Sequence, residues 1–133
     1  MTRRHSQRGS TMIEVAIAFL LFFTVLCAIM EFGRLVFAYN VLAGATREGA
    51  RYAIVHGGSS GATATSDDIA TVVRKWAIGL DSNSVTVTTT WTPSNAPGAK
   101  VKVAASYTVS PLTGMIFGGG IALGSNSQMV ISQ

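Results

Sequence analysis

The sequence predicts a membrane-anchored α+β protein, with a long N-terminal helix followed by a short helix and an antiparallel sheet of about three strands. The first observation is composition: hydrophobic residues make up 48% of the 133 residues and charged residues only 12%. An average soluble domain carries about 25% charged residues, so the deficit favours a membrane-associated chain. The second is an apolar run without proline near the N-terminus, and the third is strand-like alternation in the last third.

The apolar run from Val15 to Met30 carries no charge and is the core of the predicted membrane span, about residues 12–34. A spanning helix needs about 20 mostly apolar residues. Basic residues favour the cytoplasmic side, and three arginines precede the run: Arg3, Arg4 and Arg8. We therefore expect a single-pass protein with a cytoplasmic N-terminus and an extracytoplasmic C-terminal part. A plain signal anchor and a cleavable signal peptide are alternatives, although no A-x-A-like cleavage site follows the run.

Helical periodicity continues beyond the apolar run, from Phe32 to Ala53, as an amphipathic pattern. At 100° per residue, one broad face holds Phe32, Leu35, Val36, Tyr39, Leu42, Ala43, Ala50 and Ala53. The opposite arc holds Asn40, Gly44, Arg47, Glu48 and Arg51. The glycine-rich stretch from His56 to Gly61 should end the helix. We expect one long helix over residues 10–56.

The remaining chain reads as a Gly/Ser linker over 57–65 and a small α+β domain over 66–133. Ser66 or Asp67 is a suitable N-cap, and apolar residues then recur at helical spacing at Ile69, Val72, Val73, Trp76 and Ala77. Alternating residues and turn-forming glycines and prolines predict the strands. The expected elements are a helix from Ser66 to near Gly79, strands over 84–92 and 100–109 joined by a hairpin loop, and a last strand within 121–131 centred on 128–131.

Catalytic chemistry is absent from these patterns. Cys27 is the one cysteine and reads as a small apolar helix residue. Asp67 and Asp68 are better explained as helix-capping groups than as metal ligands, and His56 as a capping or solvated residue. Trp76 and Trp91 read as packing residues. We expect no enzyme activity, no metal and no cofactor, and the scattered basic residues predict no nucleic-acid partner.

An acidic residue deep in an apolar span is costly and functional by default, which singles out Glu14. The alternative is a carboxylate at the level of the lipid headgroups, where the cost is lower. The stretch from Arg8 to Glu14, R-G-S-T-M-I-E, resembles the processing site of type IV pilin-like proteins. The resemblance implies that a prepilin peptidase removes residues 1–9 by cutting between Gly9 and Ser10. It also implies that the new α-amine of Ser10 pairs with Glu14 of a neighbouring subunit during assembly.

Two further blocks narrow the family. The stretch from Ala45 to Ala53 resembles the A-R-E-G-A-R-Y-A signature of TadE-like proteins, and Glu31-Phe-Gly33 matches their E-x-G block. The signature residues are Glu31, Gly33, Arg47, Glu48, Gly49, Arg51 and Tyr52. The resemblance implies a minor pilin-like component of the tight-adherence (Flp) pilus machinery in a bacterial inner membrane. Its implied partners are the lipid bilayer, prepilin peptidase and other pilin-like subunits.

One position departs from the family, which often has a proline midway along the membrane segment where this chain has Phe22 and Phe23. Small residues recur every four positions at Ala45, Gly49 and Ala53, and small residues let another surface approach closely. We expect the outer domain to pack there, with a different subunit as the alternative. Two other functions are alternatives: an unprocessed bitopic protein that displays a binding domain, and a pseudopilin of a type II secretion system.

Overall fold

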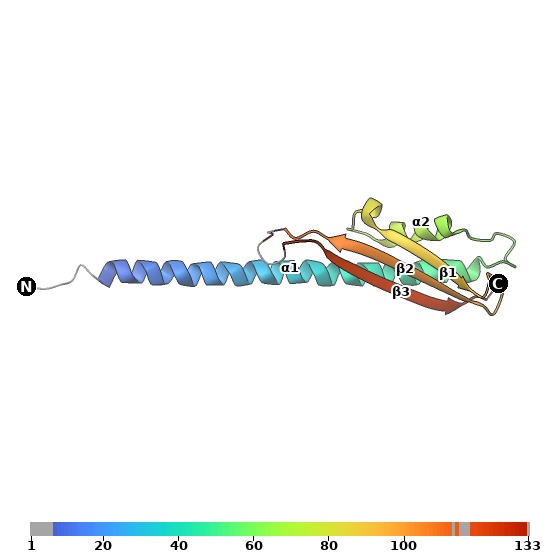
Figure 1. The fold of residues 1–133 in the computed structure, drawn as a ribbon, viewed down its shortest axis with the longest axis horizontal. Coiled ribbons are helices and arrows are strands. Elements are labelled where there is room, and N and C mark those ends of the chain that lie inside the picture. The colour runs from blue at the N-terminus through green and yellow to red at the C-terminus, as the bar shows by residue number, and fades with distance from the viewer. Residues whose placement is uncertain (1–6, 113, 115–117, 133) are drawn as a thin grey trace, which may run out of the picture. The chain divides into compact units, whose positions relative to one another are not determined.

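A computed structural model describes residues 7–112, 114 and 118–132, with side chains from Gly9 onward. Most of the leader and residues 115–117 of the glycine-rich segment lie outside the described residues. The chain divides into two compact units, one ending at Arg34 and one beginning at Leu35, and each is described by itself. The elements are α1 (Gln7–Val55), α2 (Ser66–Trp76), a 3₁₀ turn (Ser82–Ser84), β1 (Thr86–Thr92), β2 (Lys100–Val109) and β3 (Ile121–Val130) (Figure 1). The predicted fold class is confirmed.

Helix α1 is unbroken for 49 residues and passes through Phe22 and Phe23 without interruption. It begins at Gln7, earlier than the expected Ser10, and ends where the glycine-rich stretch begins. His56 closes the helix: both its backbone N–H and its Nδ1 atom lie within hydrogen-bond distance of the Tyr52 carbonyl oxygen, at 3.1 and 3.0 Å. The expected capping role of His56 is therefore confirmed.

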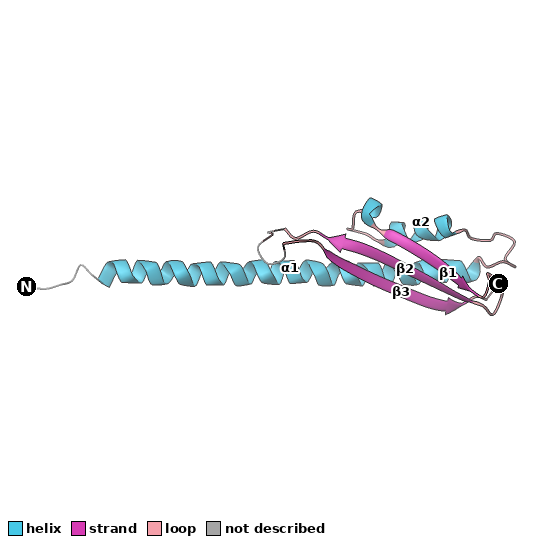
Figure 2. Ribbon diagram, in the orientation of Figure 1, coloured by secondary structure: helices cyan, strands magenta, loops and turns pink. Residues whose placement is uncertain are grey.

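The three strands form one antiparallel sheet in the order β1-β2-β3 (Figure 2). Strand β2 has the predicted bounds, Lys100–Val109. Strand β3 is longer than the expected centre at 128–131, because it pairs with β2 along all ten residues, from Ile121 opposite Val109 to Val130 opposite Lys100. The stretch Gly124-Ser-Asn-Ser127 has weak intrinsic strand preference, so its extended conformation is stabilised by pairing with β2 and not by local preference.

Helix α2 begins with a capping box at Thr65, not at the expected Ser66 or Asp67. The Thr65 hydroxyl accepts from the backbone N–H of Asp68, and the Asp68 carboxylate accepts from the backbone N–H of Thr65. These bonds satisfy N–H groups that have no partner within the helix. Hydrogen bonds from the Thr65 backbone and hydroxyl also lower the pKa of Asp68. The helix ends at Trp76, before the expected Gly79, with Ala77 as its C-cap.

Helix α2 and the part of α1 beyond Leu35 lie on one face of the sheet (Figure 1). The largest fully buried side chains between these layers are Leu42, Thr46, Ile69, Val73, Val85, Val101, Val103 and Ile131. After β3 the chain returns to α1, where the Ser132 N–H and hydroxyl donate to the Ile54 carbonyl at 3.2 and 3.0 Å. The domain therefore uses the upper part of α1 as a wall of its core.

The buried stripe of α1 is rotated from the predicted apolar face. Leu42, Ala50 and Ala53 are buried as expected, but Val36 and Tyr39 are exposed. In their place the stripe includes Ala38, Ala45, Thr46 and Gly49. The physical reason is close approach: small residues let the sheet and α2 come near the helix backbone, and bulky side chains would hold them away.

Trp76 also differs from its prediction as a packing residue, since 51% of its surface is exposed. The core-facing residues of α2 are Ile69, Ala70 and Val73, which turns Trp76 towards the edge of the helix layer. Trp91, on β1, does pack against the core as expected.

Candidate assembly surfaces

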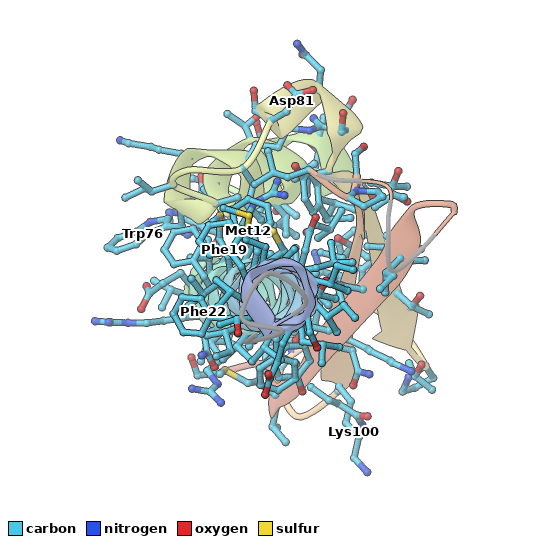
Figure 3. All side chains as sticks on the ribbon, turned by 90° about the vertical axis from the view of Figure 1, so that its left-hand side faces the viewer. Met12, Phe19, Phe22, Trp76, Asp81 and Lys100 are labelled. Carbon is cyan, nitrogen blue, oxygen red and sulfur yellow. The ribbon has the colours of Figure 1, made fainter. Side chains whose placement is uncertain are left out.

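The lower part of α1 presents a continuous apolar surface. Residues Gly9–Val55 of α1 are long and apolar enough to cross a membrane. Their most apolar 18-residue window has a mean hydropathy of 2.6, and only 6% of that window is buried. Side chains such as Met12, Phe19 and Phe22 project outward from the helix (Figure 3). So large an exposed apolar surface is unfavourable in water and suits lipid or other apolar helices.

The residues predicted for processing and assembly lie at the start of this surface. Gly9, Ser10 and Glu14 are all exposed in α1. A Cβ atom on Gly9 would meet nothing within 4 Å, so the backbone there is open to approach. Ser10 and Glu14 are four residues apart and therefore share one helix face. Within the described residues no ion pair involves Glu14; the two ion pairs are Glu31–Arg34 and Glu48–Arg51.

The E-x-G block holds the first of these ion pairs. Glu31 and Arg34 lie one turn apart on α1 with 3.5 Å between Oε2 and Nη1, and the Glu31 side chain is only 6% exposed. Pairing lowers the cost of placing a carboxylate next to an apolar span. Gly33 faces open space, because a Cβ there would meet nothing within 4 Å.

The second signature block faces both inward and outward. On the inner side, a Cβ on Gly49 would collide with Val73 of α2 and lie 3.4 Å from the side chain of Val103 on β2. The Thr46 hydroxyl donates to the Ala43 carbonyl at 3.0 Å and lies 3.3 Å from the Ser125 hydroxyl of β3. These contacts confirm that the outer domain packs on the small-residue positions of this helix.

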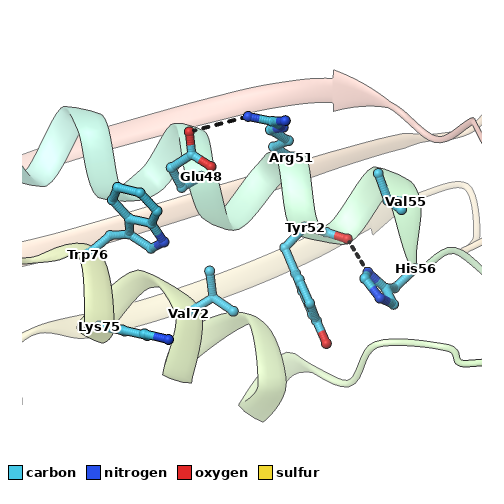
Figure 4. A pocket seen from close by; sticks show the side chains of 8 residues that line it. All are labelled: Glu48, Arg51, Tyr52, Val55, His56, Val72, Lys75 and Trp76. Carbon is cyan, nitrogen blue, oxygen red and sulfur yellow. Dashed lines mark hydrogen bonds and ion pairs between the residues drawn. The ribbon is translucent and has the colours of Figure 1, made fainter.

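Three signature residues line a shallow groove of about 320 Å³ between α1 and α2 (Figure 4). From α1 it is lined by Glu48, Arg51 and Tyr52, and from α2 by Val72, Lys75 and Trp76. Tyr52 stacks on the His56 ring with 4.1 Å between centroids. The Arg51 Nη1 and Glu48 Oε1 atoms are 3.9 Å apart and the Arg51 side chain is 73% exposed, so this pair contributes little to stability.

The sequence did not associate Lys75 and Trp76 with the signature, because α2 and α1 are joined there only by tertiary packing. Their one local signal is a basic and an aromatic residue together at the end of α2. Arg47, also in the signature, is exposed on α1 and does not line the groove. The signature is therefore divided between the core, the groove and the open surface.

The sheet face away from the helices is mostly polar. Its outward side chains alternate along each strand and include Thr88 on β1, Lys102 on β2 and Asn126 on β3. A shallow hollow of about 390 Å³ lies over Ala104 and Gly124, where side chains are small or absent. The charged residues of the sheet, Lys100 and Lys102, both stand on the central strand.

Within the described residues, no group of three or more His, Cys, Asp or Glu side chains could hold a metal ion. Asp81 caps the 3₁₀ turn, accepting from the Ser84 hydroxyl and from the Asn83 N–H, and these bonds lower its pKa.

Comparison with known proteins finds a family model that matches the N-terminal part of the chain. No curated protein and no solved structure matches the chain. The model of the family described as TadE-like protein matches residues 9–51. The matched segment begins at Gly9 and includes Glu14, the E-x-G block and the second signature block as far as Arg51, with the small-residue positions up to Gly49. It thus covers the apolar surface and most of the helix on which the outer domain packs, and over residues 9–51 the resemblance to TadE-like proteins is confirmed.

Proposed function

We propose that the protein is a pilin-like structural component of tight-adherence pilus assembly, anchored by α1 and assembled through packing of N-terminal helices. The observation that carries the proposal is the coincidence of two features in one segment. The family match covers residues 9–51, and the apolar half of the same segment is exposed. A surface of this kind serves first as a membrane anchor and then as the contact surface between subunits.

The proposed maturation step is cleavage between Gly9 and Ser10 by a prepilin peptidase. Gly9 lacks a side chain and faces open space, which suits a protease that must reach the backbone. Hydrolysis of this peptide bond leaves a carboxylate on Gly9 and a free amine on Ser10, whose reference pKa is about 7.7–8.0. The amine is therefore largely protonated at neutral pH and supplies a cation at the start of the apolar surface.

Glu14 is the proposed partner of that cation in a neighbouring subunit. Within one helix the amine and the carboxylate lie one turn apart, so a small axial shift between parallel helices brings the amine of one subunit beside the carboxylate of the next. An ion pair in apolar surroundings is costly to break by removal of one partner. Because both charges also lose their hydration, the pair adds little net stability to the helix packing. Its main effect would be to fix the axial register between neighbouring helices.

Mass spectrometry of the membrane-bound protein tests maturation. The expected chain begins at Ser10 in cells that contain active peptidase and at Met1 in cells that lack it. An intact leader in the presence of active peptidase would contradict the proposal and favour an unprocessed anchor.

Replacement of Glu14 tests assembly. Glu14→Leu should preserve membrane insertion and abolish pilus assembly, because the Ser10 amine loses its partner. Thr24→Leu is the matched control: it also removes a polar group from the apolar helix, but the Thr24 hydroxyl is already satisfied by the Leu20 carbonyl at 2.8 Å. Equal assembly by both variants would refute the pairing of amine and carboxylate.

The proposed topology places the basic leader in the cytoplasm and the outer domain outside. A cysteine at Lys100, which projects from the sheet (Figure 3), should react in intact cells with a thiol reagent that does not cross membranes. Labelling only after cell lysis would reverse the proposed orientation.

A further inference from the structure

The two edge strands of the sheet differ from the edges of most monomeric proteins. Native proteins protect edges with charged side chains, prolines or bulges, because an open edge pairs with other strands. Here β1 reads TVTTTWT and β3 reads IALGSNSQMV, with no charge and no proline in either. Both pair continuously with β2, without a bulge. The two lysines of the sheet stand on the central strand, where they protect no edge.

The two edges also run in the same direction and lie at the same level. Each is antiparallel to β2, so β1 and β3 are parallel to each other. Lys100 pairs with Thr92 on one side and Val130 on the other, and Ala104 pairs with Thr88 and Asn126. A copy moved sideways, with no shift along the strands, would bring its β1 beside β3 of the first copy.

Strand β3 also runs in the same direction as α1. Thr46 contacts Ser125, and further along both elements Ile54 contacts Ser132. An antiparallel β3–β3 dimer would point the two α1 helices in opposite directions, which two copies anchored alike in one bilayer cannot adopt. Parallel pairing of β3 with the next copy's β1 leaves both helices pointing in the same general direction, apart from the rotation that the twist of the sheet adds.

We propose that copies of this chain associate side by side through parallel pairing of β3 with β1 of the next copy. This inference uses one part of the proposed function: both copies are anchored in the same membrane with the same orientation. The outward residues that would meet, such as Asn126 with Thr88 and Gln128 with Thr90, are uncharged and able to form cross-strand hydrogen bonds. Because the two edges differ, the contact is heterologous and can be repeated from copy to copy.

The inner face of β3 favours the same arrangement. Leu123 and Met129, on the inner face of β3, are only half-buried against the core of their own copy. In the proposed pairing α2 of the next copy, which packs over β1, lies on the same face and next to these side chains. A parallel β3–β3 pair would instead place the partner's polar outward face beside them.

Disulfide trapping tests the contact in the full chain. The native Cys27 is first replaced by serine, and Thr88→Cys is combined with Asn126→Cys. Within one copy these positions are separated by two strand spacings, about 9.6 Å, whereas a disulfide needs Cα atoms within about 7 Å. Any disulfide therefore joins two copies. Oxidation of cells should give a ladder of cross-linked multimers, while mixed single variants should give dimers only.

A matched pair on the same strands controls for random collision. Thr92→Cys with Ala122→Cys lies on the same outward face, but their partners Lys100 and Thr108 are eight residues apart on β2, about 26 Å. This pair should give no ladder. Three results would each overturn the proposal: no ladder from Thr88→Cys with Asn126→Cys, an equal ladder from Thr92→Cys with Ala122→Cys, or dimers from Asn126→Cys alone.

A charge placed on the β3 edge gives a second measurement, with the reporter cysteines one pair of residues away from the charge. With Thr90→Cys and Gln128→Cys as reporters, Asn126→Lys should reduce cross-linking at least fivefold. Ser106→Lys places the same charge on the same face of the central strand and should leave it unchanged; equal loss from both would count against the contact. Mass spectrometry of the same membranes reads processing at Gly9 separately, so a mature chain without a ladder refutes this contact and leaves the proposed function intact.

Discussion

Replacing Gly49 with alanine perturbs the closest approach between α1 and the rest of the outer domain. A Cβ on Gly49 would collide with the Val73 side chain, and it would also lie 3.4 Å from Val103 and 3.6 Å from Ile69. These three side chains are fully buried, so they have little room to move. Overpacking of this kind costs about 1–3 kcal/mol.

The helix itself gains from the same substitution, because glycine is about 1 kcal/mol less favourable than alanine within a helix. The two effects oppose each other, and we expect a net loss of about 0–2 kcal/mol for Gly49→Ala. Gly49→Val adds two methyl groups to the same crowded site and should cost clearly more. For a domain of about 100 residues, each 1 kcal/mol corresponds to roughly 4–8 °C in Tm.

Gly44→Ala is the control on the same helix. A Cβ on Gly44 would meet nothing within 4 Å, so only the gain in helix preference remains. We expect it to raise Tm by a few degrees in thermal unfolding of the detergent-solubilised full chain, followed by circular dichroism. If Gly49→Ala is stabilised as much as Gly44→Ala, the close approach at Gly49 is not the constraint that we infer.

Three further predictions concern the outer domain. Leu42→Ala should lower the free energy of unfolding by about 2–5 kcal/mol in urea titration, because this side chain is fully buried; a loss below 1 kcal/mol would contradict its place in the core. Arg51→Ala should change stability by less than about 0.5 kcal/mol, since the arginine side chain is 73% exposed in its ion pair; a larger loss would mean that the groove has a structural role. Asp68→Asn should lower Tm at pH 7. The pKa of Asp68 is lowered by folding, so its carboxylate contributes stability that is present above the unfolded value of about 3.9 and is lost as pH falls through the lower folded value. The difference in Tm from the parent chain should shrink in that range, and a difference that is constant between pH 7 and pH 2.5 would refute the linkage.

Local patterns were sufficient for most elements of the fold. The absence of proline from Ser10 to Val55 and the glycines after His56 predicted the long helix and its end, which the structure places at Val55. Alternation predicted β2 to the residue. The capping residue of α2 was missed by one position, since Thr65, Ser66 and Asp67 are all good caps and only the bonds to Asp68 distinguish them.

The candidate surfaces also differ in how much of them the sequence could predict. The roles of Gly9, Ser10 and Glu14 could be proposed from a short motif, because they depend on neighbours in the chain and not on contacts within the fold. The groove beside Glu48 and Arg51 could not be found, because one of its two walls comes from α2, through Val72, Lys75 and Trp76.

The sequence by itself determined that α1 has an apolar lower half and an amphipathic upper half, since periodicity and hydropathy are local properties. Only the tertiary structure decided which side of the upper half is buried. The sheet and α2 approach along Thr46 and Gly49, and Tyr39 and Trp76 are left exposed. Periodicity ranks residues by hydrophobicity, whereas close packing selects by shape, and at this helix the smallest side chains allow the closest contact.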